Sequence, residues 1–256
     1  MSRITPAQKL RLALSGNRDE TRYDYEDYQG TSTSLYRAFD GLYVHSLNDH
    51  WSVGGFVNLN HSTYGNIDFG LTVAPAVEYN VFPYSESTRR QLRLLYKLGY
   101  NHDRYMETTV YGRMQDKVWS QSLTATVEFK QPWGDATVSV EGTSYFLGNE
   151  ESAPAGFKLL PPWTFYRLRV SGEIGVRIFK GLSVTINGRY NQIHDQLALR
   201  AGTADLTELL LRRTELASSY SYQLRLGLSY SFGSVFSNIV NPRFGGGSGG
   251  SMDYYY

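Results

Sequence analysis

Residues 69–81 read FGLTVAPAVEYNV, and nearly every second residue of this stretch is large and apolar. One set of alternate positions holds Phe, Leu, Val, Pro, Val, Tyr and Val, whereas the other holds Gly, Thr, Ala, Ala, Glu and Asn. Successive side chains of a β-strand point to opposite faces of its sheet. The pattern therefore predicts a strand with one apolar and one polar face.

The same alternation recurs along most of the chain. In residues 220–232, YSYQLRLGLSYSF, tyrosine, leucine and phenylalanine alternate with serine, glutamine, arginine and glycine. Segments of this kind, separated by turn-forming residues, predict an all-β protein. We expect ten strands, near residues 8–22, 32–47, 51–63, 67–82, 90–106, 117–131, 135–147, 163–179, 182–196 and 215–232.

Short and long connections alternate between these segments. We expect short turns near 48–50, 83–89, 132–135 and 180–181, longer loops over 23–31, 103–116, 147–162 and 196–215, and a brief connection at 63–67. Short turns at one end and long loops at the other are typical of transmembrane barrels. We therefore predict an antiparallel up-and-down transmembrane β-barrel of about ten strands, within a range of 8–12, formed by residues 1–232.

Three segments lie outside this pattern. Leu206, Leu209, Leu210 and Arg213 recur at helical spacing after Thr203, which predicts a short helix in the last long loop. Residues 233–256 are expected to form a tail with a flexible Gly/Ser-rich linker. Residues 1–6 precede no apolar stretch of the signal-peptide type, so we expect the chain to begin inside a longer protein or after a removed signal.

Composition excludes several classes of function. The chain has 256 residues, with 25 Lys and Arg against 24 Asp and Glu, and its basic residues form no run. Nucleic-acid binding is therefore not expected. The chain has no cysteine, which excludes disulfides and thiolate metal sites, and its five histidines show no metal-ligand spacing. We expect no metal, no cofactor and no catalytic residues.

Charged residues on the polar faces indicate which side of the barrel faces lipid. Many lie in mid-strand, where exposure to hydrocarbon would cost roughly 2–4 kcal/mol for each Arg or Lys. The apolar faces instead end in aromatic residues such as Trp51, Tyr79, Tyr100, Trp119 and Phe129, as in the interfacial rows of membrane barrels. We expect a lumen-lining charge network of Glu78, Arg93, Lys97, Glu128, Lys130, Glu141, Arg167, Arg169, Glu173, Arg177, Arg189 and Arg225.

The end of the last segment carries a more specific motif. Arg225, Gly227, Tyr230 and Phe232 fit the pattern polar, any, Gly, two residues, aromatic, any, aromatic. This pattern resembles the β-signal of bacterial outer-membrane proteins, except that the motif here does not end the chain. Residues 82–94 and 241–244 look like the C-terminal barrels of uncharacterised outer-membrane proteins. The resemblance implies an outer-membrane location, contact with lipopolysaccharide and the barrel assembly machinery, and a periplasmic tail.

The function expected from these features is that of a structural or anchoring barrel with a largely filled lumen. Its loops or tail could bind a protein partner. A small passive, porin-like channel is the first alternative, because basic residues outnumber acidic ones in the predicted lumen. A rim hydrolase that resembles omptin-type proteases is the second, because His61, His102 and His194 lie near the loop ends of strands. A soluble β-protein is the third alternative, since water also solvates polar faces.

Overall fold

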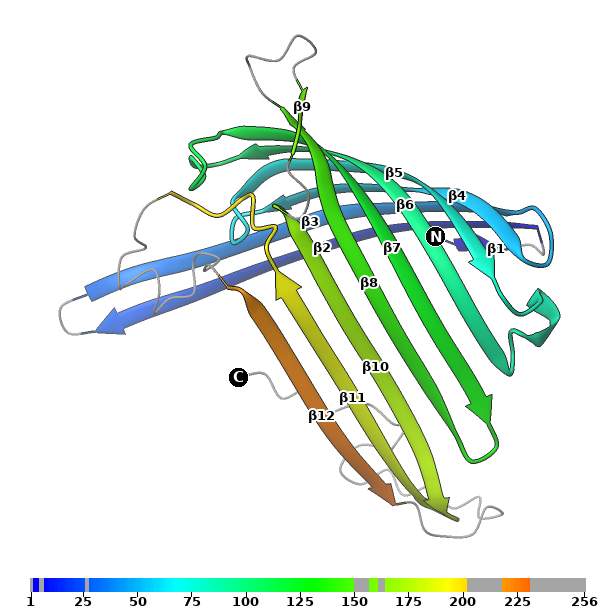
Figure 1. Ribbon diagram of the computed structural model, residues 1–256. Helices are drawn as coiled ribbons and strands as arrows, with labels where there is room; N and C mark the ends of the chain where they lie inside the picture. The colour runs from blue at the N-terminus through cyan, green and yellow to red at the C-terminus, as the bar shows by residue number, and fades with distance from the viewer. Residues whose placement is uncertain are drawn as a thin grey trace.

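A computed structural model describes residues 2–4, 7–25, 28–149, 157–160, 164–201 and 218–230. These residues form one antiparallel sheet (Figure 1). The only helical element among them is the short 3-10 turn η1, Tyr84–Glu86. No helix in the described part is long and apolar enough to span a membrane.

Ten long strands follow one another through the sheet in the order of the chain, so each is paired with its neighbours in sequence. Two three-residue strands are added: β1 (Ser2–Ile4) pairs with β2, and β9 (Phe157–Leu159) pairs with β8. The long strands are β2 (Gln8–Tyr25), β3 (Tyr28–Ser46), β4 (Trp51–Ser62), β5 (Ile67–Asn80), β6 (Arg90–Tyr105), β7 (Gln115–Gln131), β8 (Gly134–Asn149), β10 (Tyr166–Phe179), β11 (Leu182–Ile193) and β12 (Tyr220–Tyr230).

The prediction of ten antiparallel, up-and-down strands is confirmed. Most strand ends lie within a few residues of the expected positions. The first hairpin differs more, because β2 continues to Tyr25 and β3 begins at Tyr28, leaving little of the loop expected at 23–31. Tyrosine and threonine favour extended backbone, which accounts for this extension. The expected helix at 203–215, the tail at 233–256 and Phe232 lie outside the described residues.

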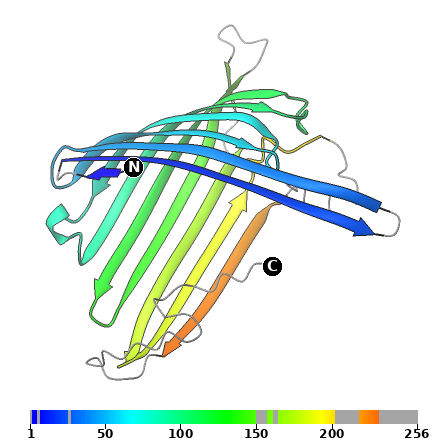
Figure 2. The ribbon, with the colours of Figure 1, turned by 180° about the vertical axis from the view of Figure 1, so that it is seen from behind.

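The sheet is strongly twisted and curved, so that it has a concave and a convex face (Figures 1 and 2). Its two outermost long strands are β2 and β12. β12 pairs with β11 alone, and β2 pairs with β3 and, over three residues, with β1. Within the described residues the sheet is therefore open between β2 and β12.

Glycine permits one close approach between neighbouring strands. A Cβ atom at Gly54 of β4 would collide with the carbonyl oxygen of Tyr43 on β3. The adjacent strands lie close at this point because Gly54 has no side chain.

The distribution of apolar side chains is unusual for a sheet protein. The buried apolar residues among those described are Ala38, Ala74, Tyr105, Val118 and Leu197. Far more large apolar side chains are exposed, and those of β12 reach 76 % exposure at Tyr222. A soluble domain covers the apolar face of its sheet with a second layer. In the described part of this chain no second layer is present.

Candidate functional site

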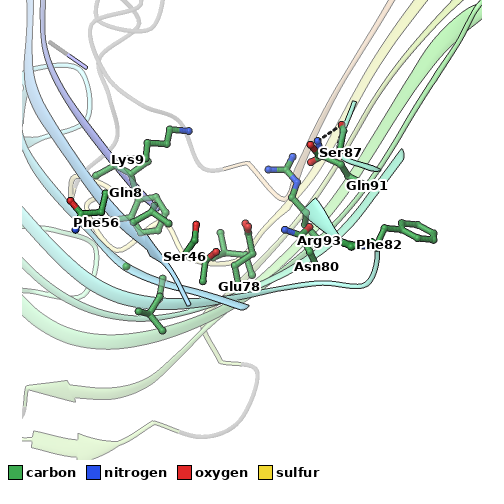
Figure 3. A pocket seen from close by; sticks show the side chains of 18 residues that line it. Gln8, Lys9, Ser46, Phe56, Glu78, Asn80, Phe82, Ser87, Gln91 and Arg93 are labelled. Atoms are coloured by element: carbon green, nitrogen blue, oxygen red, sulfur yellow. Dashed lines mark hydrogen bonds between the residues drawn. The ribbon is translucent and has the colours of Figure 1, made fainter. Parts of the chain in front are cut away.

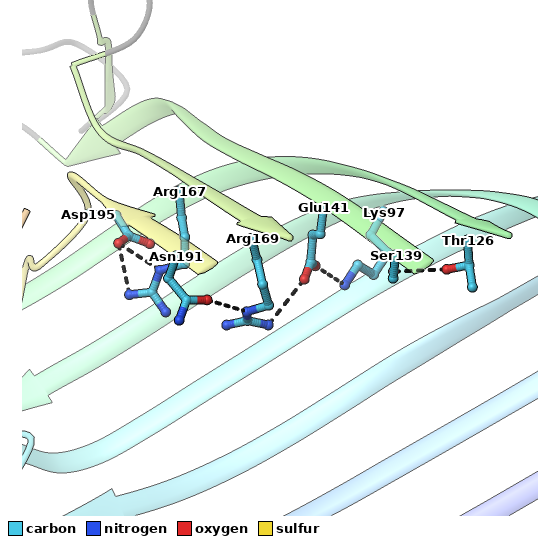
Figure 4. A network of polar contacts seen from close by, with 8 residues as sticks. All are labelled: Lys97, Thr126, Ser139, Glu141, Arg167, Arg169, Asn191 and Asp195. Atoms are coloured by element: carbon cyan, nitrogen blue, oxygen red, sulfur yellow. Dashed lines mark hydrogen bonds and ion pairs between the residues drawn. The ribbon is translucent and has the colours of Figure 1, made fainter. Parts of the chain in front are cut away.

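The twelve charged residues predicted to form a network all lie on one face of the sheet. Directly opposed residues of an antiparallel pair share a face, and the cross-strand partners connect all twelve through β5 to β12. Figures 3 and 4 show members of this set on the concave side. The residues are Glu78, Arg93, Lys97, Glu128, Lys130, Glu141, Arg167, Arg169, Glu173, Arg177, Arg189 and Arg225.

A chain of polar contacts crosses the middle of the concave face (Figure 4). Glu141 accepts hydrogen bonds from Lys97 Nζ at 3.0 Å and from Arg169 Nη1 at 3.2 Å. Arg169 Nε donates in turn to Asn191 at 3.3 Å. The Glu141 side chain is only 21 % exposed, so its two cationic partners replace water as its hydrogen-bond donors.

A second ion pair stands nearer the end of the sheet that carries the long loops, here called the loop end. Nε and Nη2 of Arg167 lie 2.9 and 2.8 Å from the same oxygen of Asp195. The Asp195 side chain is 5 % exposed, so this charge-assisted contact is shielded from solvent. It ties β10 to the segment that follows β11.

Other charges of the set are less well paired. Glu128 accepts from Lys130 at 2.6 Å, whereas Arg93 lies 3.9 Å from Glu128. Arg177 donates to the carbonyl oxygen of Pro132 at 3.4 Å. Among the described residues no ion pair reaches Glu78, Glu173, Arg189 or Arg225. The network therefore joins some of the predicted residues and leaves the rest separate.

The loop end is bridged by residues 194–201, which leave β11 and cross to two other connections. The amide hydrogens of Val110 and Ala201 bond to the carbonyl oxygens of Leu199 and Thr108. Arg200 donates to Thr63 O at 2.8 Å and pairs with Glu107 at 3.1 Å. Three connections are thereby joined over the concave face.

The side chain of Asn66 connects this bridge to the neighbouring connection through hydrogen bonds. Its side-chain amide donates to the carbonyl oxygens of Glu107 and Ala198, both at 3.0 Å, and its oxygen accepts from the Glu107 amide at 2.9 Å. Asn66 is 1 % exposed and has a positive φ of 58°, a conformation that asparagine tolerates better than most residues. The sequence signal for it is the Gly65-Asn66 pair, which lies in the connection expected at 63–67 and has no part in the alternation of the strands.

The convex face carries the apolar half of the pattern, bounded by two rows of aromatic residues. Near the short turns, here called the turn end, the ring centroids of Trp51 and Tyr79 lie 4.8 Å apart. The turn-end row comprises Trp51, Tyr79, Phe129, Phe179 and Tyr230. Nearer the loop end the rings of Tyr100 and Trp119 lie 5.2 Å apart, and Tyr190 opposes Tyr222. The loop-end row comprises Phe69, Tyr100, Trp119, Tyr166, Tyr190 and Tyr222.

Charges are absent between these rows on the strands where the pattern is clearest. The convex positions of β5, β6, β7 and β12 between the rows hold no Asp, Glu, Lys or Arg. The face is therefore uncharged as well as exposed. The concave face of the same strands carries six of the twelve residues of the charge network.

Two opposed carboxyl groups lie on the loop side of the loop-end row. Asp103 of β6 directly opposes Asp116 of β7. Asp116 is fully buried and bonds to Tyr105 Oη at 2.9 Å and to Arg113 at 2.6 Å. Burial, together with the negative charge of Asp116, raises the pKa of Asp103 to about 7. The alternation pattern carried no signal for this pair, because Asp103 lay where the expected strand 90–106 and loop 103–116 overlap, and Asp116 lay in that loop.

The three histidines of the alternative hydrolase site are separate. His61 Nδ1 contacts the carbonyl oxygen of Asp68 at 2.8 Å, and His194 stacks on Tyr166 with ring centroids 4.5 Å apart. The Nε2 atom of His102 is buried without a partner, and Asp103 projects from the opposite face of the same strand. Among the described residues no histidine bonds to a carboxylate, and no three metal-binding side chains cluster.

The fold and the two contrasting faces define the class of this chain: an all-β protein built from one antiparallel, up-and-down sheet. No family model and no curated protein sequence matches it.

Proposed function

We propose that this chain is an integral β-barrel of a bacterial outer membrane, which serves as a structural or anchoring domain with a largely filled lumen. The observation that carries the proposal is the uncharged, exposed convex face opposite a charged concave face. In water such a continuous apolar surface favours aggregation, whereas in lipid it is the solvated side. The resemblance of β12 to an outer-membrane β-signal supports the location.

The spacing of the aromatic rows suits a bilayer. Trp119 and Phe129 lie ten residues apart on the same face of β7, and so do Phe69 and Tyr79 on β5. At about 3.4 Å per residue this separation is roughly 34 Å along the strand. A strand tilted by about 45° then spans roughly 24 Å, close to the apolar band of outer-membrane barrels, about 25 Å tall.

Closure of the barrel requires β2 to pair with β12. In a ten-stranded up-and-down sheet the first and last long strands run antiparallel. Here the outer edge of β12 is unpaired in the described part of the chain, and that of β2 is paired only with the three residues of β1. Both present three alternate leucines on the convex face, and Leu14 and Leu226 are 84 % and 72 % exposed. Placing Leu12 opposite Leu226 pairs all three, because Leu10 then faces Leu228 and Leu14 faces Leu224. This register displaces β1 from Lys9–Arg11.

The same register agrees with the stagger of the sheet. Cross-strand partners lead from Lys9 on β2 around to Ile193, whose amide bonds to Ser219. With Leu12 opposite Leu226, Ser219 lies opposite Asp19, so one circuit of the barrel ends ten residues along β2 from its starting point at Lys9. Because ten is even, concave residues meet concave residues where β2 and β12 join. An offset of ten residues over ten strands is about one residue per strand, which is typical of closed barrels.

The absence of cysteine from the chain allows a direct test of closure. The double variant Leu12→Cys/Leu226→Cys, refolded into micelles and oxidised, should form an intramolecular disulfide that changes gel mobility. The matched variant Leu10→Cys/Leu224→Cys is four residues out of this register and should not. Disulfide-linked dimers in place of the internal bond, or a protein that stays folded and soluble with no detergent, would overturn the proposal.

The filled lumen is supported by the Lys97–Glu141–Arg169 contacts and by the bridge of residues 194–201. A small, slightly anion-favouring channel is the second candidate, because Arg189 and Arg225 lie on the concave face and have no ion pair with any other described residue. Recording from single molecules in planar bilayers separates the two. We expect no steady conductance, and a stable conductance that prefers anions would favour the channel.

A further inference from the structure

A cavity of about 460 Å³ lies on the concave face at the turn end, over β2 to β6 (Figure 3). Its size is within the range of sites for small organic ligands. One part of its wall is apolar and includes Leu42, Val44, Phe56 and Leu95. The remainder is polar, with Lys9, Glu78, Asn80 and Arg93 as its main groups.

Two polar atoms of this wall are buried and have no hydrogen-bond partner among the described residues: Oδ1 of Asn80 and Nε of Arg93. The two residues are directly opposed on β5 and β6. The contact between Arg93 and Glu128 is long, at 3.9 Å, and Lys130 already binds Glu128 at 2.6 Å. Buried polar atoms are normally paired, so these two directly opposed residues leave one acceptor and one donor for a ligand in the cavity to satisfy.

The charges around the cavity favour an anion. The Lys9 and Arg93 side chains point into the hollow from opposite sides, and the Glu78 carboxylate lies between them (Figure 3). No ion pair within 4 Å joins these three residues in the described structure. Two cations therefore face one carboxylate, and an incoming anion gains more from the cations than it loses to Glu78.

We propose that this cavity binds a small organic carboxylate with a neighbouring N–H or O–H group and an apolar side group. The carboxylate accepts from Arg93 Nε and is attracted by Lys9, and the N–H or O–H donates to Asn80 Oδ1. The apolar group packs against Phe56 and Leu42. The site goes beyond an anchoring role. It uses β2 to β6 alone, so it does not depend on pairing of β2 with β12.

N-acetylphenylalanine carries all three features and dissolves in water, so it serves as the probe. Its titration into the micelle-refolded protein, followed by calorimetry, is compared with two analogues. N-acetylphenylalaninamide lacks the carboxylate, and 3-phenylpropionate lacks the N–H. We expect each analogue to bind about tenfold more weakly, the effect of one lost hydrogen bond to a charged or buried group. Equal affinity for all three, or no binding of the probe, would overturn the proposal.

Substitutions of Arg93 and Glu78 should change the affinity for the probe in opposite directions. Arg93→Gln removes the main donor and should weaken binding about tenfold, whereas Glu78→Gln removes a repulsive charge and should strengthen it about threefold. Asn80→Ala should abolish the preference for the probe over 3-phenylpropionate. Arg189→Gln, on the same face but remote from the cavity, should change nothing. If Glu78→Gln weakens binding and Arg93→Gln strengthens it, the cavity is a cation site.

The disulfide test of closure separates this proposal from that of the barrel. If the Leu12→Cys/Leu226→Cys variant forms its internal disulfide but the protein does not bind the probe, the closed barrel is supported and the ligand site is refuted. If the protein binds the probe but the variant forms no internal disulfide, the ligand site is supported and the closed barrel is refuted.

Discussion

Glu141 is the residue on which the central polar contacts depend, because it accepts from both Lys97 and Arg169. We predict that Glu141→Gln destabilises the folded protein by about 1–3 kcal/mol, since two cations in a partly buried position lose their common anion. Urea unfolding in micelles, followed by tryptophan fluorescence, measures the change. Adding Lys97→Met should recover part of the loss, and a double variant as unstable as the two single losses combined would contradict the coupling.

Asp103 should make stability depend on pH. Its folded pKa of about 7 is above its ordinary value of 3.8, so its contribution to stability is fully present below about pH 4 and is lost as the pH rises through 7. Asp103→Asn should therefore be more stable than the parent, by an amount that grows between pH 4 and 7. Above pH 7 the gain should level off, on the order of 2–4 kcal/mol.

The measurement is the difference in urea midpoint between parent and Asp103→Asn at several pH values. The difference removes the titration of every other group from the comparison. A gain that is the same at pH 4 and at pH 8 would show that the carboxyl group of Asp103 is not the cause.

The bridge of residues 194–201 is the element that closes the loop end, and Asn66 fixes it. Asn66→Ala removes three hydrogen bonds and places alanine at a positive φ, whereas Asn66→Gly removes the same bonds without that strain. Both should speed hydrogen exchange at the Val110 and Ala201 amides, Asn66→Ala by a further factor of about five. Unchanged exchange at these amides would mean that Asn66 does not hold the bridge.

The elements that sequence predicted well are those with a repeated pattern. Alternation located all ten long strands, because each contains a stretch with one apolar and one polar face, although β2 and β3 continue beyond that stretch. Alternation did not predict contacts that occur only once in the structure. Asn66, the 194–201 bridge and the Asp103–Asp116 pair belong to no repeated pattern along the chain. It also placed the twelve charges on one face, yet only the structure distinguishes the paired Glu141 from the unpaired Glu78.

The proposed outer-membrane barrel requires that the convex face of the sheet contact lipid. Leu123 lies between the aromatic rows on the convex face of β7 and is 55 % exposed, while Thr124 beside it faces the concave side. In water, arginine at an exposed position such as 123 costs little. In a bilayer, Leu123→Arg should cost roughly 2–4 kcal/mol, and Thr124→Arg much less.

Unfolding from phospholipid vesicles measures both variants under the same conditions. A larger loss for Thr124→Arg than for Leu123→Arg would reverse the assignment of the two faces. Equal, small losses would indicate that neither face contacts hydrocarbon.

The interleaving of apolar and polar residues along every strand has a consequence for the chain before it folds. Because no stretch is apolar for more than a few consecutive residues, an extended chain offers nothing that a lipid bilayer would retain as a helix. The continuous apolar surface of the convex face forms only when neighbouring strands align their alternate side chains. On the proposal of an outer-membrane barrel, the unfolded chain would be compatible with water, and its affinity for lipid would arise only on folding.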